Sequence, residues 1–262
     1  MTPIPSLAPH ERILAALDVP DLASALGLVA QLRDHVGGFK VGLELCTAVG
    51  VPQVVQAVAA AGGAVFLDLK LSDIPNTVAG AVRSVCALGP AVRMLTLHCH
   101  GGAAMLRAAV ETARAAGGQR PLLLGVTVMT SLDEAALRDE LDVSVGLTDH
   151  VVHMARMAQA CGVDGVVASP HEVAAIRAVC GPNLLIVTPG VRPAWASSGD
   201  QRRVMRPAEA LRVGSDYLVI GRPLTAPPAE VGGPAAAAIR IATEVRASRG
   251  ATTGGRTPPT SA

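Results

Sequence analysis

Short apolar runs rich in branched residues alternate along this chain with longer stretches in which apolar residues recur every three or four positions. The short runs predict strands over residues 13–19, 39–45, 64–70, 93–99, 122–128, 165–169, 184–190 and 216–221. The longer stretches predict helices over residues 21–35, 51–62, 74–89, 101–117, 147–162, 171–181, 207–214 and 235–248. Because eight strand–helix units fit within 262 residues, the pattern predicts an α/β fold, a single-domain (β/α)8 TIM barrel.

The segments outside this pattern suggest how the chain is organised. Residues 1–11 are expected to form an N-terminal extension and residues 12–248 the barrel domain. The small, polar and Pro/Gly-rich residues 249–262 are expected to form a disordered C-terminal tail. The polar stretch 192–203 after the seventh strand is longer than an ordinary connection, and this predicts a lid over a site.

Composition and charge narrow the class of protein. The net charge is +1 and the arginines are scattered, which argues against a nucleic-acid or membrane-surface partner. The N-terminus carries no signal-type apolar run, and no stretch is long and apolar enough to span a membrane. The five cysteines are odd in number and lack metal-type spacing. We therefore expect a reduced, cytoplasmic protein.

The 22 cationic residues comprise only two lysines, Lys40 and Lys70, and 20 arginines. Both lysines lie at ends of predicted strands, together with Asp68 and, just beyond, Asp73. Strand alternation places Asp68 and Lys70 on one face, so the four groups are expected to form an array of alternating charge. Such an array is also compatible with a purely structural ion-pair network. A lysine ammonium, unlike a guanidinium, can donate a proton near neutral pH, which favours a catalytic role.

A second set of residues follows the last two predicted strands. The loops TPGVRP (188–193) and IGRPLT (220–225) each combine a glycine with an arginine, Arg192 in the first and Arg222 in the second. Barrels commonly bind phosphate with these two loops, and Gln201 between them offers an amide donor. The alternative is a pair of ordinary turns with solvated arginines.

Two weaker features have simple structural interpretations. His98 and His100 have the spacing of a metal pair on a strand, but no third ligand is evident, which favours a hydrogen-bonded histidine at a strand end. Thr130 and Ser131 close the fifth strand, where a helix N-cap is the simplest interpretation. No metal site is predicted.

Several of these motifs together carry a resemblance to a known family. They are ALD (16–18), FKVG (39–42), FLDLKLSDIPNT (66–77), LHCHGG (97–102), VTVMTS (126–131), TPGVRP (188–193), GDQRR (199–203) and VIGRP (219–223). The chain resembles the orotidine 5′-phosphate decarboxylases over about residues 12–225, in particular the bacterial branch whose phosphate loop reads GDQRR. Cys99 and His100 depart from the small residues expected in that family.

The resemblance implies decarboxylation of orotidine 5′-phosphate to UMP and CO2, the final step of de novo pyrimidine biosynthesis, with no metal or other cofactor. It implies a homodimer in which each site is completed by the partner. Lys70 would protonate C6 of the pyrimidine, and Asp68 would hold Lys70 and crowd the substrate carboxylate. Asp73 would reach the partner's site, with Ile74 and Thr77 beside it.

The resemblance also implies how the rest of the substrate is held. Asp18 and Lys40 would bind the ribose hydroxyls, and Thr130 with Ser131 the pyrimidine. The phosphate would be surrounded by Arg192, Gln201, Gly221 and Arg222.

Two other functions remain as alternatives. A sister group, the 3-keto-L-gulonate 6-phosphate decarboxylases and hexulose-phosphate synthases, shares the DxKxxD strand but depends on Mg²⁺. The IPNT that follows Asp73 and the GDQRR loop favour the orotidylate enzyme. A phosphate-binding barrel without catalysis is the other alternative, which the filled ionisable positions disfavour.

Overall fold

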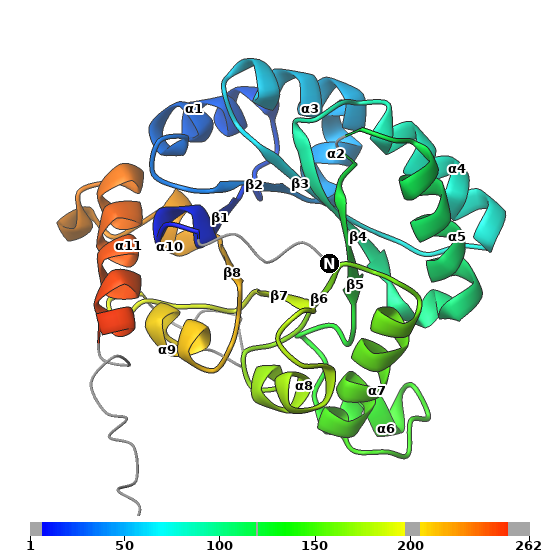
Figure 1. Ribbon diagram of the computed structural model, residues 1–262. Coiled ribbons are helices and arrows are strands. Elements are labelled where there is room, and N and C mark those ends of the chain that lie inside the picture. Colours follow the sequence, from blue (N-terminus) through cyan, green and yellow to red (C-terminus); the bar gives the residue numbers. More distant parts are fainter. Residues whose placement is uncertain (1–6, 119, 197–204, 251–262) are drawn as a thin grey trace, which may run out of the picture.

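The computed structural model describes residues 7–118, 120–196 and 205–250, with side chains up to residue 247. Eight parallel strands pair in chain order, and β1 pairs with β8, so the sheet closes into a barrel (Figure 1). The strands are β1 (Ile13–Ala16), β2 (Gly38–Val41), β3 (Val65–Leu71), β4 (Val92–His98), β5 (Leu122–Val126), β6 (Gly165–Val167), β7 (Leu185–Thr188) and β8 (Tyr217–Ile220). The predicted (β/α)8 fold is thereby confirmed.

Helices surround the barrel as an outer ring (Figure 1). They are α1 (Leu22–Leu32), α2 (Leu43–Val49), α3 (Val51–Ala60), α4 (Pro75–Cys86), α5 (Gly102–Ala115), α6 (Glu134–Asp139), α7 (Leu147–Ala160), α8 (Val173–Cys180), α9 (Pro207–Arg212), α10 (Arg222–Thr225) and α11 (Pro234–Gly250). Three 3-10 turns, η1 (His10–Arg12), η2 (Cys99–Gly101) and η3 (Ala229–Val231), lie between them. Among the described residues no single helix is long and apolar enough to cross a membrane, and α2 with α3 reach that level only together, across a 102° bend.

The strands are buried on both faces, which explains their nearly continuous apolar sequences. On β1, Ile13 and Ala15 belong to the large core between strands and helices, whereas Leu14 and Ala16 belong to a smaller cluster inside the barrel. Phe66 is another member of the inner cluster. Filling of the barrel interior by side chains leaves space for a ligand only at its ends.

The predicted second strand, 39–45, is wrong at its C-terminal end. β2 ends at Val41, and α2 begins at Leu43 with Gly42 as its N-cap. The run is apolar throughout, and a short apolar run does not distinguish a strand from a buried helix turn. The short helix α10 was not expected. A helix after Ser131 was expected and is present as α6, but its N-cap is Asp133, whose Oδ1 accepts from the Ala136 N–H at 2.9 Å, and not Thr130 or Ser131. Most of the expected lid, 192–203, lies outside the described residues.

Two arginine–aspartate pairs join neighbouring strands at their N-terminal ends, away from the ligand face. Asp216 precedes β8, and its Oδ2 accepts hydrogen bonds from Arg177 at 2.5 Å and from the backbone N–H of Ile186 on β7 at 2.8 Å. Asp164 precedes β6 and is held by Arg120 through two bonds of 2.7 and 2.8 Å. Each aspartate thus ties one strand to its neighbour.

Candidate active site

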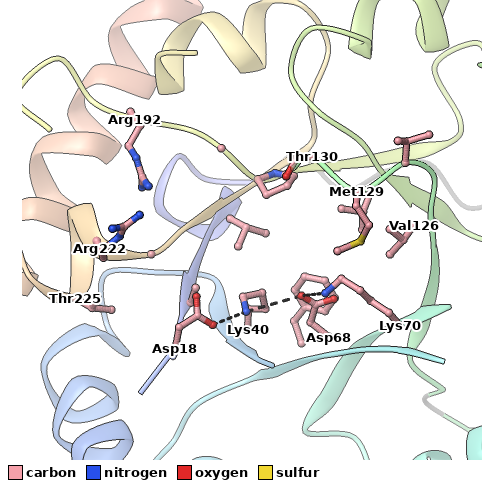
Figure 2. Close-up of a pocket in the computed structure, with 18 residues that line it drawn as sticks. Asp18, Lys40, Asp68, Lys70, Val126, Met129, Thr130, Arg192, Arg222 and Thr225 are labelled. Carbon is pink, nitrogen blue, oxygen red and sulfur yellow. Dashed lines mark hydrogen bonds and ion pairs between the residues drawn. The ribbon is translucent and has the colours of Figure 1, made fainter. Parts of the chain in front are cut away.

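A cavity of about 430 Å³ opens at the C-terminal ends of the strands, the face on which barrel enzymes carry their sites. Its size lies in the range of small-molecule sites. The cavity is lined by Ala16, Asp18, Lys40, Phe66, Asp68, Lys70, Val126, Val128, Met129, Thr130, Val167, Pro189, Gly190, Arg192, Val219, Gly221, Arg222 and Thr225. Charged groups and an apolar wall therefore face the same space (Figure 2).

A row of alternating charges crosses one side of this cavity (Figure 2). Lys40 Nζ lies 2.7 Å from Asp18 Oδ1 and 3.8 Å from Asp68 Oδ2. Lys70 Nζ donates to the same Asp68 oxygen at 2.8 Å. The Lys40 and Asp68 side chains are only 12% and 14% exposed, so each buried charge is offset by an opposite one. The structure thus brings together Lys40, Asp68 and Lys70 and adds Asp18 to the row.

Lys70 has an unusual backbone conformation. Its φ is +51°, in the left-handed region that side chains other than glycine rarely adopt. Such a conformation costs about 1–3 kcal/mol and is found mostly at functional sites. The pairing of β3 with β4 is irregular here, because Leu67 faces Leu95 but Leu71 faces Leu97. The strand therefore bulges at the position that carries Lys70.

The neighbourhood of Lys40 leaves little room for a larger cation. A Cβ atom at Gly42 would lie 3.1 Å from Lys40 Nζ and 3.6 Å from Asp18 Oδ1. The absence of a side chain at Gly42 therefore lets the ammonium fit between the carboxylates of Asp18 and Asp68. A planar guanidinium is bulkier than an ammonium, which accounts for lysine at position 40.

Two arginines lie close together at the end of the cavity away from Lys70 (Figure 2). Burial lowers the pKa of Arg192, and the nearby charge of Arg222 lowers it further. The buried Nε of Arg192 has no hydrogen-bond partner among the described residues. Arg192 is placed by its backbone N–H, which donates to the carbonyl of Met205 at 3.0 Å. Two like charges at one end of a cavity favour binding of an anion between them.

Some residues expected at the site lie elsewhere in the structure of the single chain. Asp73, Ile74 and Thr77 are exposed beside the first turn of α4, and Asp73 Oδ1 accepts a hydrogen bond from the backbone of Ile74 at 2.6 Å. Ser131 lines a separate, more open hollow next to α6. Gln201 lies outside the described residues. The charge array of one chain thus lacks Asp73.

The paired histidines are linked by hydrogen bonds at the end of β4. His98 Nδ1 accepts from the backbone N–H of His100 at 3.4 Å, and the two Nδ1 atoms lie 3.1 Å apart. Burial, followed by His100 and Lys70, lowers the pKa of His98. Among the described residues no group of three or more histidine, cysteine, aspartate or glutamate side chains is arranged to hold a metal ion. Between these histidines, burial raises the pKa of the Cys99 thiol to about 12.

Comparison with known proteins identifies the family of this chain. A family model described as "Orotidine 5'-phosphate decarboxylase / HUMPS family" matches residues 11–238. The chain belongs to this family. It is 54% identical over 239 residues to a protein of Moorella thermoacetica named orotidine 5′-phosphate decarboxylase, covering 90% of this chain and 92% of that one. It is 52% identical to the protein of the same name from Anaeromyxobacter sp. (strain K), covering 90% of this chain and 99% of that one.

Solved structures of similar sequence have the same fold. The crystal structure of orotidine 5′-phosphate decarboxylase from Lactobacillus acidophilus superimposes with a TM-score of 0.77 at 33% identity, covering 89% of this chain and 98% of that one. An uncharacterized conserved protein from Geobacillus kaustophilus gives a TM-score of 0.75 at 35% identity, covering 89% and 99%. The resemblance inferred from the motifs is confirmed.

For this member of the decarboxylase family, the apolar wall of the cavity was not foreseen from the sequence. Val126, Val128 and Val167 line it, with Met129 nearby (Figure 2). Their signal is present in the sequence, because alternate residues near the end of a strand point into the barrel. That signal does not distinguish a residue that lines a ligand cavity from one that fills the core. Thr96 on β4 was missed for the same reason.

Proposed function

We propose that this chain decarboxylates orotidine 5′-phosphate to UMP and CO2 without a metal or organic cofactor. One observation carries the proposal: the order of groups along the cavity. The arginine pair lies at one end, the Asp18–Lys40 pair in the middle and the Asp68–Lys70 pair at the other end (Figure 2). A nucleoside monophosphate carries its phosphate, ribose and base in the same order.

In this proposal, Lys70 protonates the carbon from which CO2 leaves. The bond between C6 and the carboxylate breaks, and its electron pair remains on C6. The Lys70 ammonium stabilises that developing charge more strongly than it stabilises the neutral ring, and then donates a proton to C6. The resulting amine is reprotonated from solvent. Asp68 supports this role because its Oδ2 accepts the 2.8 Å hydrogen bond from Lys70 Nζ.

The other groups hold the substrate. Asp18, bridged to Lys40 at 2.7 Å, is 60% exposed and so remains accessible to ribose hydroxyls. Arg192 and Arg222 bind the phosphate beside Gly221, and we assign Gln201, which lies outside the described residues, to the same group. Thr130 faces the pyrimidine edge, assisted by Ser131, while the apolar wall packs against the ring. Phosphate binding far from C6 can then supply free energy for loop closure and exclusion of water.

The active form in this proposal is a homodimer. Ile74 is 66% exposed and Leu43 is 58% exposed. Ile74 adjoins Asp73 and Thr77, so one apolar and two polar side chains are exposed together around the start of α4. Asp73 and Thr77 lie on the same surface and are available to complete the site of a second copy. A second copy would supply the Asp73 that the array of one chain lacks.

We place this activity in the cytoplasm. All five cysteines are unpaired, and Cys46, Cys99, Cys161 and Cys180 are buried. Unpaired buried thiols behave as small hydrophobic residues and suit a reducing compartment.

The decisive experiment follows the absorbance of orotidine 5′-phosphate with purified protein, with and without EDTA. We expect loss of the orotate band at an unchanged rate in EDTA. Activity abolished by EDTA and restored by Mg²⁺ would instead indicate the Mg²⁺-dependent sister chemistry. No loss of the band at micromolar enzyme would indicate a barrel that binds phosphate ligands without catalysis.

A further inference from the structure

The bulge in β3 lies opposite one residue of β4. Leu67 faces Leu95 and Leu71 faces Leu97, so three β3 residues, 68 to 70, lie against the single residue Thr96. A bulge of this kind removes backbone groups from the regular ladder, and they need other partners. The Lys70 N–H finds its partner in a side chain, because it donates to Thr96 Oγ1 at 2.8 Å.

The number of protons on each group fixes the donor and the acceptor in the hydrogen bond between Thr96 and Asp68. A hydroxyl has one proton to donate, and a backbone N–H only donates. Thr96 Oγ1 accepts from Lys70, so its own proton is available for Asp68 Oδ1, which lies 3.0 Å away. The other carboxylate oxygen, Asp68 Oδ2, accepts from Lys70 Nζ at 2.8 Å. Three hydrogen bonds therefore close a ring from the Lys70 backbone through Thr96 and Asp68 to the Lys70 ammonium.

The burial of Thr96 makes this ring specific to a hydroxyl. Thr96 is completely buried, and Met94, two residues earlier on the same face, belongs to the apolar cluster inside the barrel. Branched apolar residues dominate such interior positions. A hydroxyl is tolerated there only when it is fully hydrogen-bonded, as it is here. Thr96 does not line the cavity and so does not touch the substrate.

We propose that Thr96 is the positioning residue of the Asp68–Lys70 pair: it holds the Lys70 backbone in its left-handed conformation and fixes the orientation of the Asp68 carboxylate. This inference rests on the proposed role of Lys70. Thr96 acts through these two residues, so its loss changes the placement of the ammonium relative to C6. Lys40 keeps its closer partner Asp18 at 2.7 Å, and the arginine pair lies at the other end of the cavity, so we expect the contacts to ribose and phosphate to be retained. Loss of the Thr96 hydroxyl should therefore lower kcat and leave KM nearly unchanged.

The test compares Thr96→Val and Thr96→Ala, which lack the hydroxyl, with Thr96→Ser, which keeps it. A hydrogen bond to a charged group is worth enough to predict a fall in kcat of about 10- to 100-fold for Val and Ala. KM should stay within about twofold of wild type, as expected when ground-state binding is untouched. Thr96→Ser should restore kcat to within about threefold, because the hydroxyl is retained.

Thr127→Val is the matched control. Thr127 is also completely buried, and its hydroxyl donates to the carbonyl of Val167 at 3.0 Å. That carbonyl also accepts from the Thr127 backbone N–H at 3.2 Å, so it keeps a partner in the variant. We expect wild-type kcat in Thr127→Val. Equal losses of kcat in the Thr127 and Thr96 variants, in step with their melting temperatures, would reduce Thr96 to a structural role and overturn the proposal.

Lys70→Ala in the same assay distinguishes failure of the proposed role of Thr96 from failure of the proposed role of Lys70. If Lys70→Ala is inactive and the hydroxyl-free Thr96 variants keep wild-type kcat, Thr96 has no positioning role and the proposed function stands. A Thr96→Ser variant no more active than Thr96→Val also overturns the proposal. If Lys70→Ala retains activity, the role of Lys70 fails and the role of Thr96 fails with it.

Discussion

At the scale of single residues, the two lysines of the chain are explained by different properties: the size of the cation at position 40 and its ability to donate a proton at position 70. Lys40 is held between two carboxylates in a tight space, where even a Cβ atom at Gly42 would lie 3.1 Å from its ammonium. Size therefore explains why position 40 is not arginine. Lys70 is 26% exposed and lines the cavity. What arginine cannot supply at position 70 is a proton.

Lys70→Arg tests this distinction. The substitution keeps the positive charge but removes the proton donor, so we expect kcat to fall by at least about 100-fold. The measurement is the loss of orotidine 5′-phosphate absorbance under saturating substrate. Arg93→Lys, a reverse exchange of cations at an exposed position on β4, is the control and should have wild-type turnover. Near-normal activity of Lys70→Arg would contradict proton donation by Lys70.

At the scale of secondary-structure elements, the order of strands and helices was predictable, and the local irregularities were not. Alternating apolar runs fix the eight-stranded barrel, because each strand must be buried on both faces. Simple alternation also predicted that Asp68 and Lys70 would share a face, and both do line the cavity. The path between them is not regular, however, since Lys70 is left-handed and the strand bulges opposite Thr96. Pairing between distant strands creates that bulge, and no local pattern encodes it.

The opposite ends of the strands are expected to control stability and not activity. Asp216→Ala would leave Arg177, whose side chain is 18% exposed, without its carboxylate, and the N–H of Ile186 without its acceptor. We expect urea denaturation to show a loss of about 2–4 kcal/mol in the free energy of unfolding. Turnover of the folded variant should be unchanged, because the pair lies away from the ligand face.

The control for this prediction is Asp139→Ala. Asp139 pairs with Arg138 at 2.7 Å, but both side chains are more than 60% exposed, at 62% and 61%. Exposed ion pairs contribute little because water and salt screen them, so the denaturation midpoint should not move. Equal effects in the two variants would show that Asp216 does not tie β7 to β8.

At the scale of the whole molecule, the proposed shared site predicts complementation between inactive subunits. Lys70→Ala removes a group from the site of its own chain, whereas Asp73→Ala removes a group from the site of the partner. A mixed dimer would contain one site with both groups intact and one site with neither. Half of the dimers formed by random reassociation of equal amounts are mixed, and each has one intact site of two, so about one quarter of wild-type activity should be restored across the single isologous interface of a twofold dimer. The measurement is turnover after the two variants are dissociated together and allowed to reassociate.

Each variant taken through the same dissociation and reassociation alone is the control. Activity of the mixture equal to the sum of the two separate samples would contradict a shared site. Sedimentation of the wild-type chain as a monomer under assay conditions would contradict it independently.

The three-against-one pairing of β3 with Thr96 also limits how this chemistry can be transplanted. Grafting the β3 sequence Asp-Leu-Lys alone onto another barrel would transfer the side chains. It would not transfer the backbone conformation that orients them. A regular strand has no left-handed residue at that position, and its neighbour would offer no hydroxyl to a displaced N–H. The smallest unit that could be grafted is therefore a pair of adjacent strands. The second strand must carry a residue with a small hydroxyl side chain at the position of Thr96.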